Sequence, residues 1–183
     1  MKNIDENIIE KVLFSEEEIE KKVSEIAATI NEDYKGKKVL MLCILKGSVI
    51  FFADLVRKLD LETEFDFMVV SSYGNSATTT GQVMIVKDLG KSIEDTHVII
   101  VEDILDTGTT LGYLKNILLQ RHPASLKICT LLDKPSRRTN DLKADYSGFV
   151  IPDEFVVGYG LDYAEKFRDL PFVGVLSPKV YKK

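Results

Sequence analysis

Cysteine is scarce in this chain, which has two cysteines among its 183 residues. Cys43 and Cys129 each lie inside an apolar, strand-like stretch. Such positions are typical of buried free thiols, which behave as small hydrophobic side chains. We therefore expect two reduced, buried cysteines, and neither a disulfide nor a metal site between them.

Long hydrophobic runs and an excess of positive charge are also missing. No apolar run is long enough to cross a bilayer, and the first six residues, MKNIDE, lack the apolar core of a signal peptide. The chain carries 24 Lys and Arg against 29 Asp and Glu, a net charge of −5, which disfavours non-specific binding to nucleic acid. These absences predict a soluble, cytoplasmic protein with no membrane and no nucleic-acid partner.

The hydrophobic content is sufficient for one folded unit. Hydrophobic residues make up 45% of the 183 residues, enough for a sizeable core. We see no linker, internal repeat or low-complexity segment. The expected organisation is a single domain over residues 1–183.

A helix near the N-terminus is the clearest local signal. In Ser15-Glu16-Glu17-Glu18, Ser15 matches the N-cap and Glu18 the third helical position of a capping box. Five apolar residues then recur at helical spacing on one face: Ile19, Val23, Ile26, Ala27 and Ile30. Gly36 is expected to end the helix.

Strands and helices alternate along the rest of the chain. Strands are predicted over 39–45, 65–70, 83–86, 97–101, 126–132, 146–151 and 172–176, helices over 49–59 and 109–119, and a mobile polar loop over 71–81. This order indicates an α/β fold with a mostly parallel sheet and helices on both faces. Since ligands bind beyond the carboxyl ends of such strands, we expect Lys46-Gly47, the segment 102–110 and Lys134 to converge.

Residues 98–111, VIIVEDILDTGTTL, carry the strongest functional signal. A buried strand leads into the carboxylates Glu102, Asp103 and Asp106, then into a Thr-Gly-Thr-Thr loop and a helix. A helix N-terminus after such a loop favours a phosphate. Carboxylates beside a phosphate would repel it, which suggests a cation between them, Mg²⁺ in particular.

Four further segments stand beside this motif: Leu45-Lys46-Gly47-Ser48, Ser71-Ser72-Tyr73-Gly74, Asp133-Lys134-Pro135, and residues 151–163 (IPDEFVVGYGLDY) with Phe167-Arg168-Asp169-Leu170. Taken alone, each has a purely structural interpretation as a turn or a connection. Phe155 and Val156 can equally be core residues.

Together the segments resemble a known family. The stretch around Glu102-Asp103 and Asp106-Thr107-Gly108 is similar to the phosphoribosyl-pyrophosphate (PRPP) signature of type I phosphoribosyltransferases. From about Leu13 to the C-terminus the chain resembles the hypoxanthine-guanine phosphoribosyltransferase family in its bacterial form. The resemblance implies the type I fold, with a small hood built from terminal segments. It also implies a purine salvage enzyme that converts PRPP and hypoxanthine or guanine to IMP or GMP and pyrophosphate.

The resemblance also assigns roles at the PRPP end. Asp106 matches the general base near purine N7, and Mg²⁺ would be held at Glu102, Asp103 and, through pyrophosphate, Asp162. Lys46 and Gly47 would bind pyrophosphate, with Arg168 adding charge. The family often has a cis peptide beside Lys46, at Leu45-Lys46 or Lys46-Gly47. The implied PRPP-binding residues are Glu102, Asp103, Ile104, Leu105, Thr107, Gly108, Thr109 and Thr110.

The base end follows the same resemblance. Lys134 would donate to O6 of the purine, which disfavours adenine because adenine presents an amino group there. Phe155 would stack on the ring, the Val156 carbonyl would read its edge, and Asp162 belongs to the same purine-binding set. Ser72 and Tyr73 would close over the reactants as a lid.

Two alternatives stay open at this stage. One is a PRPP-sensing regulator on the same fold, against which the full set of catalytic residues and the acidic charge argue. The other is a related enzyme for another base, of which xanthine is the hardest to exclude. Thr109 stands where some family members carry Lys or another larger residue, which bears on PRPP affinity. A homodimer or homotetramer is carried over from the family.

Overall fold

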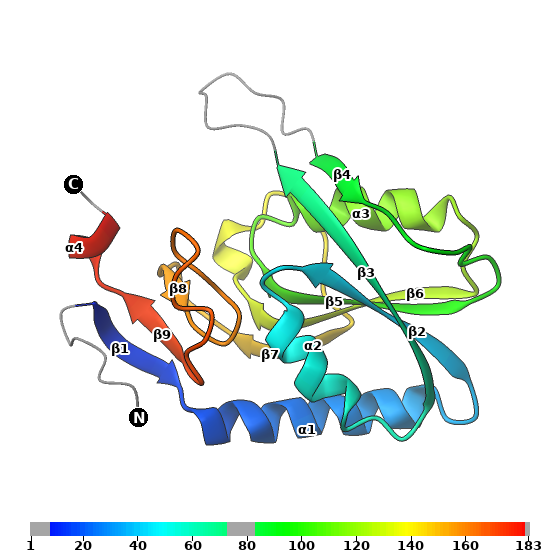
Figure 1. The fold of residues 1–183 in the computed structure, drawn as a ribbon, viewed down its shortest axis with the longest axis horizontal. Coiled ribbons are helices and arrows are strands. Elements are labelled where there is room, and N and C mark those ends of the chain that lie inside the picture. The colour runs from blue at the N-terminus through cyan, green and yellow to red at the C-terminus, as the bar shows by residue number, and fades with distance from the viewer. Residues whose placement is uncertain (1–7, 73–82, 182–183) are drawn as a thin grey trace.

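The computed structural model describes residues 8–72 and 83–181. Figure 1 shows a large sheet flanked by helices, with a smaller sheet at one end. The elements are β1 (Ile9–Phe14), α1 (Glu16–Asp33), β2 (Lys38–Leu45), α2 (Val49–Val56), β3 (Glu62–Ser72), β4 (Val83–Lys87), β5 (His97–Leu105), α3 (Thr109–Leu119), β6 (Ser125–Asp133), the 3₁₀ turn η1 (Pro135–Arg137), β7 (Tyr146–Val150), β8 (Val156–Val157), β9 (Val173–Leu176) and α4 (Pro178–Tyr181).

The large sheet has the strand order β4-β3-β2-β5-β6-β7. The pairs from β3 to β7 are all parallel, and β4 runs antiparallel to β3 at the edge. The central strands β2 and β5 are almost continuously apolar, as expected for strands covered on both faces. This arrangement confirms the predicted α/β fold with a mostly parallel sheet.

Two hydrophobic clusters cover the two faces of this sheet. The first joins α1 and α2 to one face, with Phe51 and Ile30 among its fully buried members. The second lies beneath α3, where Leu111, Leu114 and Leu118 pack on the opposite face. The helices therefore fix the sheet from both sides and leave the carboxyl ends of its strands for the loops that follow them.

Helix α1 forms as the sequence predicts. The Ser15 hydroxyl accepts a hydrogen bond from the Glu18 amide, and the Glu18 carboxylate accepts one from the Ser15 amide. The expected apolar face is buried, and its members are Ile19, Val23, Ile26, Ala27 and Ile30. The helix ends at Asp33, three residues before Gly36, which adopts a positive φ of 73° in the turn.

The small sheet has the order β1-β9-β8 and is antiparallel throughout. Its strands come from the two ends of the described chain, which agrees with the hood expected of terminal segments. β1 and β8 were not predicted, because β8 has only two residues and β1 alternates too irregularly to give a period-two signal.

Several element boundaries differ from the sequence prediction; β3, for example, begins at Glu62 and not at residue 65. α2 ends at Val56 and not at residue 59, because the amides of Lys58 and Leu59 bond three residues back, to Leu55 and Val56, in a tightened turn. β5 runs four residues past Val101, because β6 continues beside it and pairs Glu102 with Thr130 and Leu105 with Asp133. The first two carboxylates of the motif therefore lie in a strand and not in a loop.

Both cysteines are free and buried, as predicted. The Cys43 sulfur lies 3.2 Å from the Ser48 hydroxyl, and burial raises the pKa of this thiol to about 11. Among the described residues, no helix has the length and apolar character needed to cross a membrane. Most of the predicted polar loop over 71–81 lies outside the described residues.

Candidate active site

The turn between β5 and α3 presents backbone amides and hydroxyls at the start of a helix. Gly108 stands at the N-cap position with φ of 79°, and a Cβ there would lie 2.6 Å from the Asn140 side chain. The Thr109 amide donates to the Thr107 hydroxyl at 3.3 Å. A glycine turn that leads into an 11-residue helix directs free N–H groups outward, a geometry that suits an anion.

A cavity of about 230 Å³, here called the β5–α3 cleft, lies against this turn. Its walls are Ile44, Leu45, Gly47, Val70, Glu102, Asp103, Ile104, Leu105, Asp106, Thr107, Gly108, Thr110 and Leu111. All but one of the predicted PRPP-binding residues thus line one cavity. Thr109 is the exception, an exposed residue at the first helical position.

Gly47 brings the turn after β2 directly against β5. A Cβ on Gly47 would lie 1.7 Å from an Asp103 carboxylate oxygen, so no larger residue fits without moving the carboxylate. The peptide bond between Leu45 and Lys46 is cis, which settles the choice that the sequence left open. The Lys134 amide donates to the Leu105 carbonyl at 3.0 Å. The three segments expected to converge therefore meet at the end of β5.

Glu102 and Asp103 are carboxylates held out of bulk water. Burial raises the pKa of Glu102 well above its usual range, and the neighbouring Asp103 raises it further. Burial also raises the pKa of Asp103 to about 6, although the Ile104 amide, at 2.7 Å, and the Arg168 charge oppose the shift. A cation beside two adjacent, poorly solvated carboxylates stabilises their charged forms.

Arg168 reaches this region from the loop before β9. Its guanidinium pairs with Asp162 at 2.8 Å and donates to the Gly160 carbonyl at 2.8 Å. Glu165 lies between the two predicted pyrophosphate cations, 3.1 Å from Lys46 and 3.6 Å from Arg168. The Lys46 and Arg168 side chains thus share one carboxylate, which the sequence analysis did not single out.

Asp106 stands where the strand ends, with two arginines beside it. Arg137 lies 3.2 Å from one Asp106 carboxylate oxygen, and that oxygen is buried without a hydrogen bond from any described residue. Arg138 donates to the backbone carbonyl of Asp106 at 3.1 Å and to that of Leu105 at 3.2 Å. Neither arginine was predicted, because Arg137-Arg138 in the sequence looks like an ordinary charged turn.

A second cavity, of about 620 Å³, opens on the other side of Asp106 and is here called the Lys134 pocket. Its walls are Ile104, Asp106, Lys134, Arg137, Asp153, Glu154, Phe155, Val156, Leu161, Asp162 and Tyr181. Every predicted purine-binding residue lies in this wall. Because Ile104 and Asp106 line both cavities, the β5–α3 cleft and the Lys134 pocket adjoin at these two residues.

Lys134 is buried, with 6% of its surface exposed, and it donates to the Glu154 carbonyl at 2.9 Å. Phe155 is 40% exposed and stacks on Tyr181, with ring centroids 5.2 Å apart. Val156 belongs to β8 and is buried. Tyr181 is an aromatic wall residue that the sequence analysis missed, since nothing in a near-terminal Tyr predicts its position beside Phe155.

Two of the predicted site residues fall at the edge of what the structure describes. Ser72 is the last residue of β3, where its backbone pairs with Val83. Tyr73 lies outside the described residues.

Across residues 8–72 and 83–181, no group of three or more His, Cys, Asp or Glu side chains is arranged to hold a metal ion. Glu102 and Asp103 do not form such a group with Asp162, which is paired with Arg168. A carboxylate pair fits Mg²⁺, which is commonly held by one or two carboxylates together with substrate phosphate oxygens.

Comparison with known proteins identifies this arrangement. The family model described as a phosphoribosyl transferase domain matches residues 11–164. The chain is 54% identical over 174 residues to hypoxanthine-guanine phosphoribosyltransferase of Bacillus subtilis (strain 168), covering 95% of this chain and 97% of that protein. It is 51% identical to the enzyme of the same name from Staphylococcus aureus (strain Mu50), covering 96% of this chain and 98% of that one.

The fold gives the same result. A crystal structure of a hypoxanthine phosphoribosyltransferase from Staphylococcus aureus matches with a TM-score of 0.95 and 49% identity, covering 100% of both chains. The family match, the two relatives and the fold all agree with the motifs from which the site was built. The chain belongs to the phosphoribosyl transferase domain family and, within it, to the hypoxanthine-guanine phosphoribosyltransferases.

Proposed function

We propose that this chain transfers the 5-phosphoribosyl group of PRPP to hypoxanthine or guanine and releases IMP or GMP and pyrophosphate. The observation that carries the proposal is the meeting of two cavities at Asp106: a cleft built for phosphate on one side and a pocket with a buried lysine and an aromatic ring on the other. One domain over residues 1–183 suffices for this reaction.

The β5–α3 cleft suits the ribose 5-phosphate half of PRPP. The turn of Thr107, Gly108 and Thr110 offers amides and hydroxyls at the start of α3, with Thr109 beside it, so the 5′-phosphate is held there. Ile104 and Leu105 place the turn at the end of the strand. Glu102 and Asp103 then face the ribose hydroxyls.

The pyrophosphate half extends toward the turn after β2. Gly47 approaches so closely that its backbone can face the ligand, and Lys46 and Arg168 add positive charge. Glu102 and Asp103, with Asp162 through pyrophosphate, would hold Mg²⁺, and the cation would neutralise charge on the leaving group. The raised pKa values of the Glu102 and Asp103 carboxyls support a cation at this point.

The chemical step breaks the bond between C1′ and the pyrophosphate oxygen, and the electron pair leaves with pyrophosphate. The purine N9 lone pair forms the new bond to C1′. Asp106 accepts the N7 proton or holds it in a strong hydrogen bond as N9 attacks. Its place on the wall common to both cavities supports this role, because the base and the ribose must meet there.

Base selection depends on the Lys134 pocket. The Lys134 ammonium, which donates to the Glu154 carbonyl at 2.9 Å, lies within the pocket wall and can donate to O6 of a 6-oxopurine. Adenine carries an amino donor at that position and leaves the lysine without an acceptor. Phe155 stacks on the ring, and the Val156 carbonyl reads its edge beside Asp162. Ser72 and Tyr73 close over the reactants and exclude water.

The chain works in the cytoplasm as a homodimer or homotetramer. An exposed apolar surface supports association. Phe65 of β3 contacts Phe52 of α2 (ring centroids 5.4 Å apart), and Met84 and Val86 lie on the same sheet face, since Ile85 between them packs against the opposite cluster. Exposed apolar patches of this kind mark interaction surfaces. Sedimentation of the purified chain measures the assembly, and a monomer at micromolar concentration would contradict it.

An absorbance assay tests the function directly. The chain is mixed with PRPP and Mg²⁺ and, in separate reactions, with hypoxanthine, guanine, xanthine or adenine. We expect hypoxanthine and guanine to be converted and adenine not to be converted. Chelation of Mg²⁺ should stop turnover. If PRPP binds and no base is converted, the chain is not this enzyme, and a PRPP-binding regulator becomes the better account.

A further inference from the structure

We propose that Tyr159 and Asp54 are positioning residues for the pyrophosphate end of the active site. Both lie outside the walls of the β5–α3 cleft and the Lys134 pocket. They join the loop that carries Arg168 to helix α2 and thereby fix the backbone on which pyrophosphate binds. The inference rests on the proposed function, since it assigns a role in PRPP binding.

The backbone around Tyr159 adopts an uncommon conformation. Gly158, Tyr159 and Gly160 have consecutive positive φ angles of 98°, 49° and 102°. Glycine tolerates this region, whereas a bulky aromatic residue is seldom found there. Such a conformation persists only where the surrounding structure holds it, and residues of this kind cluster at functional sites.

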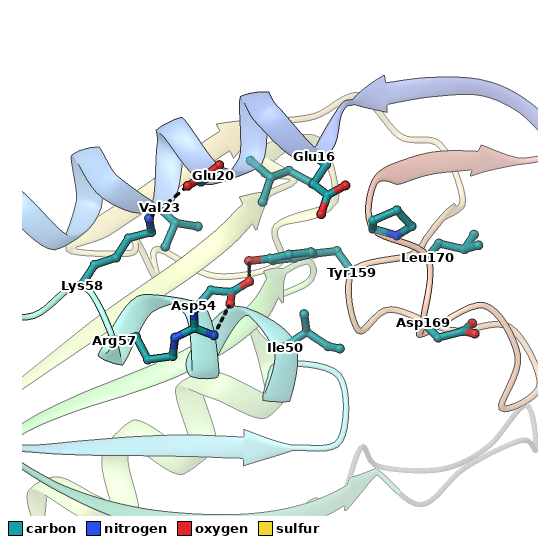
Figure 2. Close-up of a pocket in the computed structure, with 12 residues that line it drawn as sticks. Glu16, Glu20, Val23, Ile50, Asp54, Arg57, Lys58, Tyr159, Asp169 and Leu170 are labelled. Carbon is teal, nitrogen blue, oxygen red and sulfur yellow. Dashed lines mark hydrogen bonds and ion pairs between the residues drawn. The ribbon is translucent and has the colours of Figure 1, made fainter. Parts of the chain in front are cut away.

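A partly buried hydrogen bond holds Tyr159 in place. Its hydroxyl donates to the Asp54 carboxylate at 2.7 Å, and its amide donates to the Leu170 carbonyl at 2.8 Å. Figure 2 shows the Tyr159 ring between α1 and α2, directed at Asp54, with Arg57 on the other side of that carboxylate. A cavity of about 500 Å³ borders the ring, so the hydrogen bond supplements packing that is incomplete on that side.

Gly160, the residue after Tyr159, connects Tyr159 to the active site through a close backbone contact. A Cβ on Gly160 would lie 1.9 Å from the Gly47 carbonyl oxygen, and a Cβ on Gly47 would lie 1.7 Å from Asp103. Gly160, Gly47 and Asp103 are therefore stacked with no room for a methyl group between them. A displacement of Tyr159 moves this stack, because close-packed backbone cannot yield locally.

Arg168 depends on the same residue. The Gly160 amide donates to the Arg168 carbonyl at 2.9 Å, and the Arg168 guanidinium donates to the Gly160 carbonyl at 2.8 Å. Gly160 thus fixes both the backbone and the charged end of Arg168. The tyrosine beside it sets the distance between the Arg168 charge and the Gly47 backbone, which are the two features that would grip pyrophosphate.

The test is Tyr159→Phe, which keeps the ring and removes only the hydroxyl. We expect the KM for PRPP to rise about three- to tenfold, while the KM for hypoxanthine and kcat stay within about twofold of wild type. The wild-type enzyme is measured in the same assay. Its turnover tests the proposed function, so a failure there is separate from a failure of Tyr159→Phe to change the KM.

Tyr146→Phe is the matched control. Tyr146 is also buried, and its hydroxyl also donates to a carboxylate, that of Asp33, at 2.7 Å. This bond joins the start of β7 to the end of α1, away from both cavities. The two variants lose the same kind of interaction, and only Tyr159→Phe is expected to change the KM for PRPP.

Substitution of Asp54 tests the other partner. Asp54→Ala should reproduce the selective rise in the KM for PRPP, and Asp54→Asn, which keeps an acceptor for the hydroxyl, should restore most of the wild-type value. The proposal is overturned if Tyr159→Phe and Asp54→Ala both leave the KM for PRPP within about twofold of wild type. An equal rise in the KM for both substrates, or the same rise in Tyr146→Phe, overturns it as well.

Discussion

Helix α1 and the carboxyl end of β5 differ in how completely their side chains are packed and hydrogen-bonded. In α1 a complete capping box begins the helix and the apolar face is buried without exception, so local sequence and packing agree. At the end of β5 two half-buried carboxyls have raised pKa values, and a buried carboxylate oxygen of Asp106 lacks a hydrogen-bond partner among the described residues.

The difference separates stability from function. Groups that are poorly satisfied in the substrate-free protein are the groups that a charged ligand would satisfy, and proteins tolerate them at sites where ligands bind. Variants at the end of β5 should therefore change activity without loss of stability. Variants in α1 should do the reverse.

Asp106→Asn should give the largest effect on activity. The amide cannot accept the N7 proton, so kcat should fall by about 10² to 10⁴. The melting temperature should stay near that of wild type, because the ion pair of this carboxylate with Arg137 is exposed to solvent and such pairs add little stability. Steady-state kinetics with hypoxanthine and thermal unfolding provide the two readouts. If the variant kept the full kcat, Asp106 would not be the general base.

Ile30→Ala should give the largest effect on stability. The side chain is fully buried in the cluster beneath α1, and its truncation costs about 2 to 5 kcal/mol of unfolding free energy. Denaturant unfolding measures the loss. The kinetic constants per folded molecule should not change, and a drop in kcat that matches the loss of stability would break the distinction between the two regions.

Asp103→Asn sharpens the comparison through its pH dependence. Burial raises the pKa of Asp103 from 3.8 to about 6, so the folded protein binds this proton more tightly than the unfolded chain. Protonation of Asp103 therefore favours the folded protein at low pH, and this stabilisation is lost as the pH rises through about 6. At pH ~7 and without metal, Asp103→Asn should gain about 1 to 3 kcal/mol of unfolding free energy, and the gain should vanish below pH ~4.

Asp88→Asn is a control for which the expected change in stability at neutral pH has the opposite sign. The Arg121 guanidinium, 2.8 Å away, lowers the pKa of Asp88, so its charged form stabilises the fold above the ordinary carboxyl pKa. The amide variant should lose stability at neutral pH and match wild type in acid. If Asp103→Asn also lost stability at neutral pH, the conclusion that burial raises the pKa of Asp103 would be wrong.

Ser15→Ala gives the smallest expected effect. Loss of the hydroxyl that caps the Glu18 amide should cost about 1 kcal/mol. Ser24→Ala in the same helix should cost nothing, because that hydroxyl bonds to the Glu20 carbonyl, which the helix already satisfies. Thermal unfolding compares the two. Equal losses in both variants would show that the capping box contributes no stability.

The sequence predicts most of the fold because its local signals agree with the packing. α3 begins and ends where predicted, at Thr109 and Leu119, because the Thr-Gly turn and the apolar period mark both ends. The end of β5 was placed four residues early, since polar residues in a strand give no hydrophobic signal and only the partner strand β6 extends it.

The site was less accessible to sequence reasoning. The convergence of Gly47, Asp106 and Lys134 follows from the rule for parallel sheets, and the structure bears it out. Arg137 beside Asp106 and Tyr181 beside Phe155 depend on tertiary contacts that no local pattern encodes. The stacking of Gly160 on Gly47 is likewise visible only in three dimensions, because the two residues are far apart in the chain.

The most direct test of a joint site at Asp106 measures both products in one reaction. The chain is incubated with PRPP, Mg²⁺ and hypoxanthine, and the nucleotide and pyrophosphate are quantified together. We expect IMP and pyrophosphate in equal amounts, with one hypoxanthine consumed for each PRPP, because the β5–α3 cleft and the Lys134 pocket meet at Asp106. Consumption of PRPP without nucleotide, or binding of PRPP without consumption, would contradict a single joint site.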